Sequence, residues 1–170
     1  EYKKLFQVSH LAGKLNKTYG HSLRHELLSR RDEIQRDTVF HHTYGDRHNI
    51  EDARMGKIDV FSPSQFGVAI ENTQHRGYFT EKILDLFLLK SVPIYWGCTN
   101  IGYFFNTDGI ITVNSVDDII HAINVLDKNS YDIVFKKAVE ENYQTAKKYV
   151  DYEQNIVDYI TKVFTENGIL

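Results

Sequence analysis

Lys82 is the residue of this chain whose position most directly indicates a chemistry, the binding of an anion. It follows Thr80 and Glu81, and Thr80 is a predicted N-cap for the helix that begins there. Backbone N–H groups and the positive end of the helix dipole stabilise an anion at such a helix start. A lysine beside those donors needs a negative partner, and a phosphate would supply one. The alternative is that Lys82 pairs with a neighbouring carboxylate on a solvated helix face.

Arg24 is the second candidate ligand for an anion. It follows Gly20 on a segment expected to open a helix, and from there a guanidinium could hold two phosphate oxygens at once, as an ammonium cannot. The alternative is a surface arginine that pairs with a nearby glutamate or aspartate.

The elements around Lys82 predict where such a site would lie. Residues 66–70 form a short apolar run, as expected of a strand covered on both faces. Apolar residues at helical spacing follow within 83–88, and residues 92–95 are typical of the next strand. A strand, helix and strand joined this closely form a right-handed crossover of a parallel sheet, whose ligands bind beyond the carboxyl ends of the strands.

The rest of the chain alternates strands and helices in the same way. Strands are expected at residues 5–9, 38–40 and 110–113, helices at 21–32, from the N-cap Ser115 through Ile123, at 131–149 and at 152–164, and loops at 13–20 and 41–56. This alternation predicts one α/β domain over residues 1–170, a single doubly wound, mainly parallel Rossmann-like sheet flanked by helices.

Composition limits the classes of function. The 170 residues are 42% hydrophobic and 25% charged, as in an ordinary globular domain. The formal charge of −3 argues against bulk electrostatic binding of nucleic acid, so an anion site must be local. No apolar run approaches the roughly 20 residues that span a bilayer. The single cysteine, Cys98, excludes an internal disulfide and a multi-cysteine zinc site, and its place after a predicted strand favours a small buried thiol.

Histidines are the candidate metal ligands, and their spacing argues against a metal site. His21 and His25 are four residues apart on an expected helix face, while His41, His42 and His48 lie together in a polar segment. The sequence lacks the His-Glu-x-x-His order of zinc proteases and offers no obvious third ligand. A metal is therefore not expected. No cofactor is expected either.

Several motifs, in order and at the right spacing, resemble one enzyme family. They are Ala69–Asn72, Gly77–Lys82, Val92–Gly97 and Asn100–Ile101. This stretch strongly resembles the donor-binding half of the family 10 glycosyltransferases, the α1,3/α1,4-fucosyltransferases. The resemblance is specific from about Phe66 to Val113, and Gly20–Arg24 upstream is similar to the helix start where that family places a phosphate-binding arginine. It implies the C-terminal half of a GT-B glycosyltransferase that binds a GDP-sugar, GDP-fucose above all.

The resemblance also implies roles for five residues. Arg24 and Lys82 would neutralise the donor diphosphate, and Glu81 would accept hydrogen bonds from the ribose hydroxyls. Asn72 and Tyr78 match positions that line the donor site. The alternatives for these two are that Asn72 caps a turn and that Tyr78 packs against the rim of the sheet.

The general base of the family belongs to an N-terminal domain, and no carboxylate of this chain can be matched to it. Catalysis would then need an upstream segment, a partner subunit or an unfamiliar base, and the glycan acceptor would be bound by a missing N-terminal domain or another chain. The chain begins at Glu1 without a Met, which is consistent with a removed segment. The lack of disulfides favours a cytoplasmic location, with the Golgi lumen as the alternative if an N-terminal anchor has been removed.

Three hypotheses follow from these residues. The first is a GDP-fucose-type glycosyltransferase domain that transfers the sugar with inversion to a glycan hydroxyl. The second is a nucleotide-sugar-binding module without transferase activity. The third is an unrelated flavodoxin-like α/β domain that acts in protein interaction, in which Arg24 and Lys82 are merely solvated.

Overall fold

A parallel sheet forms the centre of the computed structural model, which describes residues 3–35, 40–45, 50–150 and 165. Its five strands are β1 (Leu5–Gly13), β2 (Phe40–Gly45), β3 (Ser64–Ile70), β4 (Val92–Trp96) and β5 (Ile111–Thr112). They are hydrogen-bonded in the order β2-β1-β3-β4-β5, and every neighbouring pair is parallel. The chain moves outward in one direction from β1 and in the other from β3, so the point of reversal lies between these two strands.

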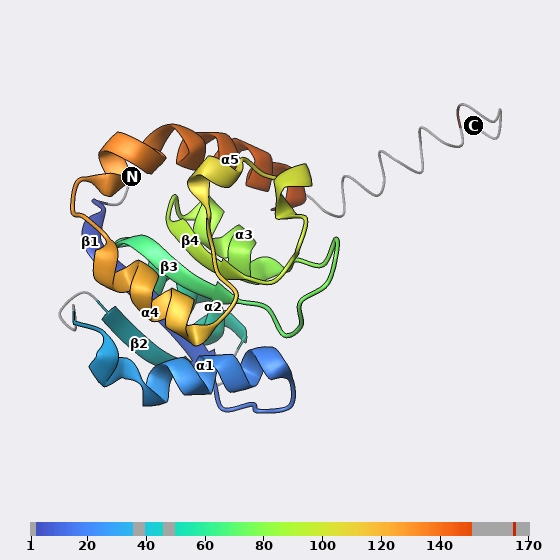
Figure 1. The fold of residues 1–170 in the computed structure, drawn as a ribbon. Coiled ribbons are helices and arrows are strands. Elements are labelled where there is room, and N and C mark those ends of the chain that lie inside the picture. Colours follow the sequence, from blue (N-terminus) through green and yellow to red (C-terminus); the bar gives the residue numbers. More distant parts are fainter. Residues whose placement is uncertain (1–2, 36–39, 46–49, 151–164, 166–170) are drawn as a thin grey trace.

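Helices cover both faces of this sheet (Figure 1). They are α1 (Tyr19–Ser29), α2 (Ile50–Phe61), α3 (Glu81–Leu88), α4 (Val116–Val125) and α5 (Lys136–Val150). The helices α1 and α4 lie together on one face, while α2 and α3 lie on the other and α5 packs against α3. The predicted doubly wound α/β fold is therefore confirmed.

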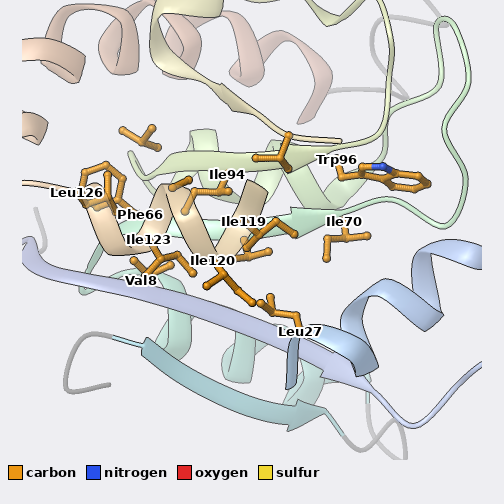
Figure 2. Packing of buried hydrophobic residues seen from close by; sticks show 14 of the residues in the cluster. Val8, Leu27, Phe66, Ile70, Ile94, Trp96, Ile119, Ile120, Ile123 and Leu126 are labelled. Atoms are coloured by element: carbon orange, nitrogen blue, oxygen red, sulfur yellow. The ribbon is translucent and has the colours of Figure 1, made fainter. Parts of the chain in front are cut away.

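The apolar core is divided by the sheet into two layers. In the first, Ile119 and Ile123 of α4 lie over Val8, Phe66 and Ile94 of the strands (Figure 2). The second layer is built mainly from α3 and the opposite face of the sheet. All seven residues of β3 are buried, as a strand covered on both faces requires. The central strand is thereby packed along its whole length, up to its carboxyl end.

The crossover from β3 through α3 to β4 agrees with the sequence prediction. Thr80 caps α3, its hydroxyl oxygen accepting a hydrogen bond from the backbone N–H of Lys82. Ser115 caps α4 in the same way and forms a capping box with Asp118. Both predicted caps are confirmed.

The prediction of a loop at residues 41–56 is wrong for 41–45 and 50–56, and residues 46–49 lie outside the described residues. β2 extends to Gly45, and α2 begins at Ile50. The segment of β2 has little apolar character in the sequence because β2 is the edge strand of the sheet. Within α2, Gly56 interrupts an otherwise helical pattern and lowers the helix propensity.

Other boundaries differ by a few residues. The helix predicted at 21–32 begins at Tyr19, after the cap Thr18, and ends at Ser29, where a 3₁₀ turn at Arg31–Glu33 takes over. The first strand continues past residue 9 to Gly13 because its last residues pair with β2, while its pairing with β3 ends at His10; propensity cannot reveal such pairing.

Toward the C-terminus, the strand predicted at 110–113 shortens to Ile111–Thr112. The helix predicted at 131–149 begins with a π-helical turn, Tyr131–Phe135, that leads into α5. The helix predicted at 152–164 lies outside the described residues. Among the helices that the structure does describe, none has the length and apolar character needed to cross a bilayer.

Candidate functional site

The predicted site residues meet at the carboxyl end of β3, between the N-terminal ends of α1 and α3. The backbone N–H of Gly20 donates to the carbonyl of Asn72 at 3.1 Å, which ties the start of α1 to the loop after β3. A Cβ atom at Gly20 would lie 1.7 Å from the carbonyl oxygen of Glu71. Only a glycine lets α1 approach the strand this closely, so Gly20 is what brings Arg24 to this end of the sheet.

Arg24 is buried and bonded to the end of β3. Its Nε donates to the carbonyl oxygen of Ile70 at 3.0 Å, and its Nη2 donates to Asn72 Oδ1 at 2.9 Å. Nη2 also donates to the Ile70 carbonyl. Because Arg24 is only 8% exposed, the alternative of a surface arginine is wrong. The planar guanidinium instead bridges a backbone carbonyl and an amide side chain, as its fork of donors allows.

Lys82 lies in the first turn of α3, as predicted, and its ammonium is held by three oxygens. Its Nζ is 3.0 Å from Thr80 Oγ1, 3.3 Å from Glu81 Oε1 and 3.5 Å from Glu71 Oε2. The carboxylate pairing that the sequence left open is therefore present, although Glu71 comes from the end of β3 and not from the helix face. A quarter of the Lys82 side chain, 24%, remains exposed to a ligand.

Glu81 is an exposed carboxylate beside two lysines. Partial burial acts to raise the pKa of Glu81, but the attraction of Lys82 and Lys57, together with hydrogen bonds from Lys82 and Thr80, outweighs it and lowers this pKa below its ordinary value. Glu81 is thus ionised at neutral pH and has only acceptor oxygens. Its 57% exposure leaves those oxygens accessible to hydroxyl groups.

Tyr78 and Asn72 complete the group. Burial raises the pKa of the Tyr78 phenol, the negative charges of Glu71 and Glu81 raise it further, and Arg24 opposes them. Tyr78 therefore lies close enough to both carboxylates and to the guanidinium for their charges to act on its hydroxyl. Because its pKa is raised, the phenol keeps its proton and can donate a hydrogen bond. Asn72 is half-buried, and its side-chain oxygen is engaged by Arg24.

Glu71 also belongs to the site, although it is not among the residues predicted from the sequence. It is fully buried, and it accepts hydrogen bonds from the backbone N–H and the hydroxyl of Thr80 at 2.8 and 2.6 Å. The signal in the sequence was a carboxylate directly after an apolar strand and directly before Asn72. Cys98 is buried at the end of β4, as predicted.

Within the described part of the chain, no group of three histidine, cysteine or acidic side chains is arranged to hold a metal ion. His21 and His25 are engaged separately: a ring nitrogen of His21 is 2.7 Å from Thr18 Oγ1, and one of His25 is 3.1 Å from the carbonyl oxygen of Leu15. The histidines at 41, 42 and 48 have no described side chains.

The sequence of residues 16–134 matches the family model for the C-terminal part of glycosyltransferase family 10, the fucosyltransferases. The chain belongs to glycosyltransferase family 10. All five predicted site residues lie inside the matched range, and membership excludes the third hypothesis, that of an unrelated α/β domain.

Curated relatives in the family are fucosyltransferases. The chain is 34% identical over 80 residues to an α-(1,3)-fucosyltransferase of Helicobacter pylori, a match that covers 44% of this chain and 17% of that protein. It is 32% identical over 118 residues to a putative fucosyltransferase of Acanthamoeba polyphaga mimivirus, covering 66% of this chain and 19% of the relative. The chain therefore spans less than a fifth of the length of these relatives.

Solved structures share the fold. A crystal structure of an α1,3-fucosyltransferase superimposes with a TM-score of 0.56 at 24% identity, covering 90% of this chain and 46% of that one. A complex of such an enzyme with GDP-fucose gives 0.57 at 23% identity, covering 89% and 47%. The family 10 chain thus has the fold of about half of a solved fucosyltransferase.

Proposed function

We propose that this family 10 chain binds the GDP-sugar donor of a glycosyltransferase, with GDP-fucose as the sugar nucleotide, and that the sugar is transferred with inversion to a glycan hydroxyl. One observation carries the proposal. Two consecutive residues at the end of β3 hold the two predicted phosphate ligands, since the carbonyl of Ile70 accepts from Arg24 and the carboxylate of Glu71 lies beside Lys82. Two cations from different helices are thereby placed at one strand end, where ligands of parallel sheets bind.

The proposed chemistry is charge stabilisation on the leaving group. As the acceptor oxygen forms its bond to the anomeric carbon, the bond from that carbon to the β-phosphate oxygen breaks and GDP leaves with the bonding electrons. Arg24 and Lys82 would stabilise the negative charge that grows on the diphosphate, each by about 1.5–3 kcal/mol where water is excluded. In this proposal the two side chains supply the positive charge that a metal ion provides in other transferases.

The remaining residues would fix the nucleoside. Glu81, ionised and exposed, is suited to accept hydrogen bonds from the two ribose hydroxyls. Tyr78 offers a protonated phenol and a flat ring at the same edge, and Asn72 orients Arg24 through the 2.9 Å bond between them. We assign the glycan acceptor, and the base that takes its proton, to an N-terminal domain or a second chain.

Isothermal calorimetry with GDP, UDP, guanosine and GDP-fucose tests this function. Saturable binding of GDP and GDP-fucose, with weaker binding of UDP and guanosine, is expected. Arg24→Lys should weaken GDP while leaving guanosine unchanged, because the charge is kept but the fork that holds Ile70 and Asn72 is lost. A chain that binds none of the four compounds would refute the proposal.

Turnover separates a transferase from the second hypothesis, a binding module. Release of fucose from GDP-fucose, with water as the acceptor, should be measured with the chain alone and again with a glycan acceptor present. Binding of GDP-fucose without release in either assay would support the module, whereas slow release would support a catalytic donor half.

A further inference from the structure

Glu71 is a fully buried carboxylate that lies beside Lys82, and its burial requires an explanation of its own. It follows the last residue of β3 and is 0% exposed. A buried charge is retained only where other groups compensate for its lost hydration. Groups at the start of α3 contact its oxygens: the Thr80 backbone N–H at 2.8 Å, the Thr80 hydroxyl at 2.6 Å and the Lys82 ammonium at 3.5 Å.

The backbone packs closely around the Glu71 side chain. A Cβ atom at Gly97 would lie 2.5 Å from Glu71 Cγ, so a side chain at position 97 would displace the carboxylate. Gly20 of α1 packs directly against the Glu71 carbonyl. The Glu71 backbone N–H donates to the carbonyl of Trp96 at 2.9 Å. Segments that follow three different strands therefore converge on this one residue.

The ion pairs of Lys82 are longer than those of neighbouring lysines. Other lysines near α3 pair at 2.7 Å, as Lys57 does with Asp85 and Lys90 with Glu140. Lys82 is nearest to a neutral hydroxyl, that of Thr80 at 3.0 Å, and its carboxylate contacts are longer, at 3.3 and 3.5 Å. Its ammonium is thus oriented while part of its charge stays available to another anion.

We propose that Glu71 is the positioning residue of the diphosphate site: its buried carboxylate holds Thr80 and Lys82 in one arrangement, so that the ammonium meets an incoming diphosphate already oriented. This inference rests on the proposed function for its ligand. Orientation before binding lowers the entropy that a flexible lysine would lose when the ligand arrives. Glu71 acts through Lys82 and needs no contact with the donor.

Binding of GDP and guanosine to Glu71→Gln tests the proposal. Glutamine keeps an oxygen for Thr80 but removes the charge beside Lys82, so GDP affinity should fall about tenfold while guanosine affinity is unchanged. In a Lys82→Ala background, Glu71→Gln should change GDP affinity less than twofold, because the group that it positions is gone. Glu140→Gln, which removes a carboxylate from a lysine at the opposite end of α3, is the matched control and should change neither affinity.

Three results would overturn the proposal: unchanged or tighter GDP binding in Glu71→Gln, equal losses for GDP and guanosine, or an undiminished loss in the Lys82→Ala background. Equal losses would mean that Glu71 only supports the fold.

The order of the lysine ammonium in the wild-type chain gives a second measurement that does not depend on GDP. In ¹⁵N NMR of the lysine Nζ groups, Lys82 should be more restricted than Lys137, whose side chain is 91% exposed. Equal mobility would overturn the positioning role even if GDP binds. A wild-type chain that does not bind GDP would refute the proposed function instead, and the mobility of Lys82 in Glu71→Gln, which should rise above that of the wild type, would still decide whether Glu71 positions this lysine.

Discussion

The two ends of β3 each hold a lysine, in opposite surroundings. At the carboxyl end, Lys82 lies beside Glu71 and Glu81 and is 24% exposed. At the amino end, the Nζ of Lys4 donates to neutral oxygens, the carbonyl of Ser64 at 2.9 Å and the hydroxyl of Ser91 at 2.9 Å. Burial lowers the pKa of Lys4 to about 7, so Lys4 loses its charge far more easily than an ordinary lysine.

The difference follows from the direction of a parallel sheet. Carboxyl ends of strands lead into helix N-termini, which offer N–H donors and positive dipole ends. Amino ends receive helix C-termini, whose last carbonyls need donors: Lys4 also reaches the carbonyl of Phe61, the last residue of α2, at 3.4 Å. Lys4 is accordingly a structural lysine that donates to backbone carbonyls, and Lys82 is the lysine that we propose as a phosphate ligand.

The largest expected effect is a loss of stability when a side chain is added at Gly20, where α1 packs against the end of β3. In Gly20→Ala, the new methyl group would meet the Glu71 carbonyl, and the backbone on one side must move. We expect a loss of about 3 kcal/mol or more in the free energy of unfolding, measured in urea. Gly13→Ala is the control, because nothing lies within 4 Å of its Cβ position. Similar small losses in both variants would mean that α1 is not held against the strand end.

Replacing Lys82 and Lys4 separately tests the proposed difference between the two ends of β3. Lys82→Ala should weaken GDP binding about 10- to 100-fold, the value of a charged hydrogen bond to phosphate, and should also lower stability, because it removes the cation beside the buried Glu71 carboxylate. Lys4→Met should leave GDP binding unchanged. The measurement is calorimetric titration of both variants; equal affinities would remove the functional distinction between the two ends.

The pH dependence of stability should depend on Lys4. Its pKa is lowered from 10.5 to about 7 in the folded chain, so between these values the unfolded chain binds more protons. The stability of the wild type should therefore rise with pH across this window, relative to Lys4→Met, by less than about 1.4 kcal/mol per pH unit. Urea unfolding at pH 6, 7, 8 and 9 measures the difference. Parallel curves for the two proteins would show that Lys4 keeps its ordinary pKa.

The smallest effect is expected at Ser91, which is buried between Lys4 and the start of β3. Its hydroxyl accepts from Lys4 and donates to the Ser64 carbonyl at 2.8 Å. Ser91→Ala should cost about 1 kcal/mol of stability in thermal or urea unfolding and leave GDP affinity unchanged. A loss of GDP binding in this variant would show that the two ends of β3 are coupled.

Features of the site that depend on consecutive residues were predictable from the sequence. Contacts between residues far apart in the sequence were not. The cap at Thr80 and the place of Lys82 in the first turn depend on a few consecutive residues, and both predictions are confirmed. The bond between Arg24 and Asn72 joins residues 48 positions apart and depends on α1 following β1 beside β3. The family resemblance named both residues, but it did not say that they bind each other.

The misassigned segment at 41–56 has a related cause. Predicting a strand requires an apolar run or an alternating pattern, and β2 satisfies neither because it pairs on one side only, with β1. Its strand conformation comes from that pairing. The buried strands β3 and β4, which are covered on both faces, carried the apolar signal and were placed correctly.

By itself the sequence determined the crossover from β3 to β4, the helix caps, the family and the residue types that could bind a diphosphate, because these depend on neighbouring residues and on motif order. Only the tertiary structure decided which charged groups are buried and which groups they pair with. Glu71 is buried because Gly20 and Gly97 let two other segments close over it, and the pKa of Lys4 is lowered because helix and strand ends bury it among uncharged oxygens. Burial and pairing of charges depend on which segments meet in space, and the order of strands in the sheet determines that.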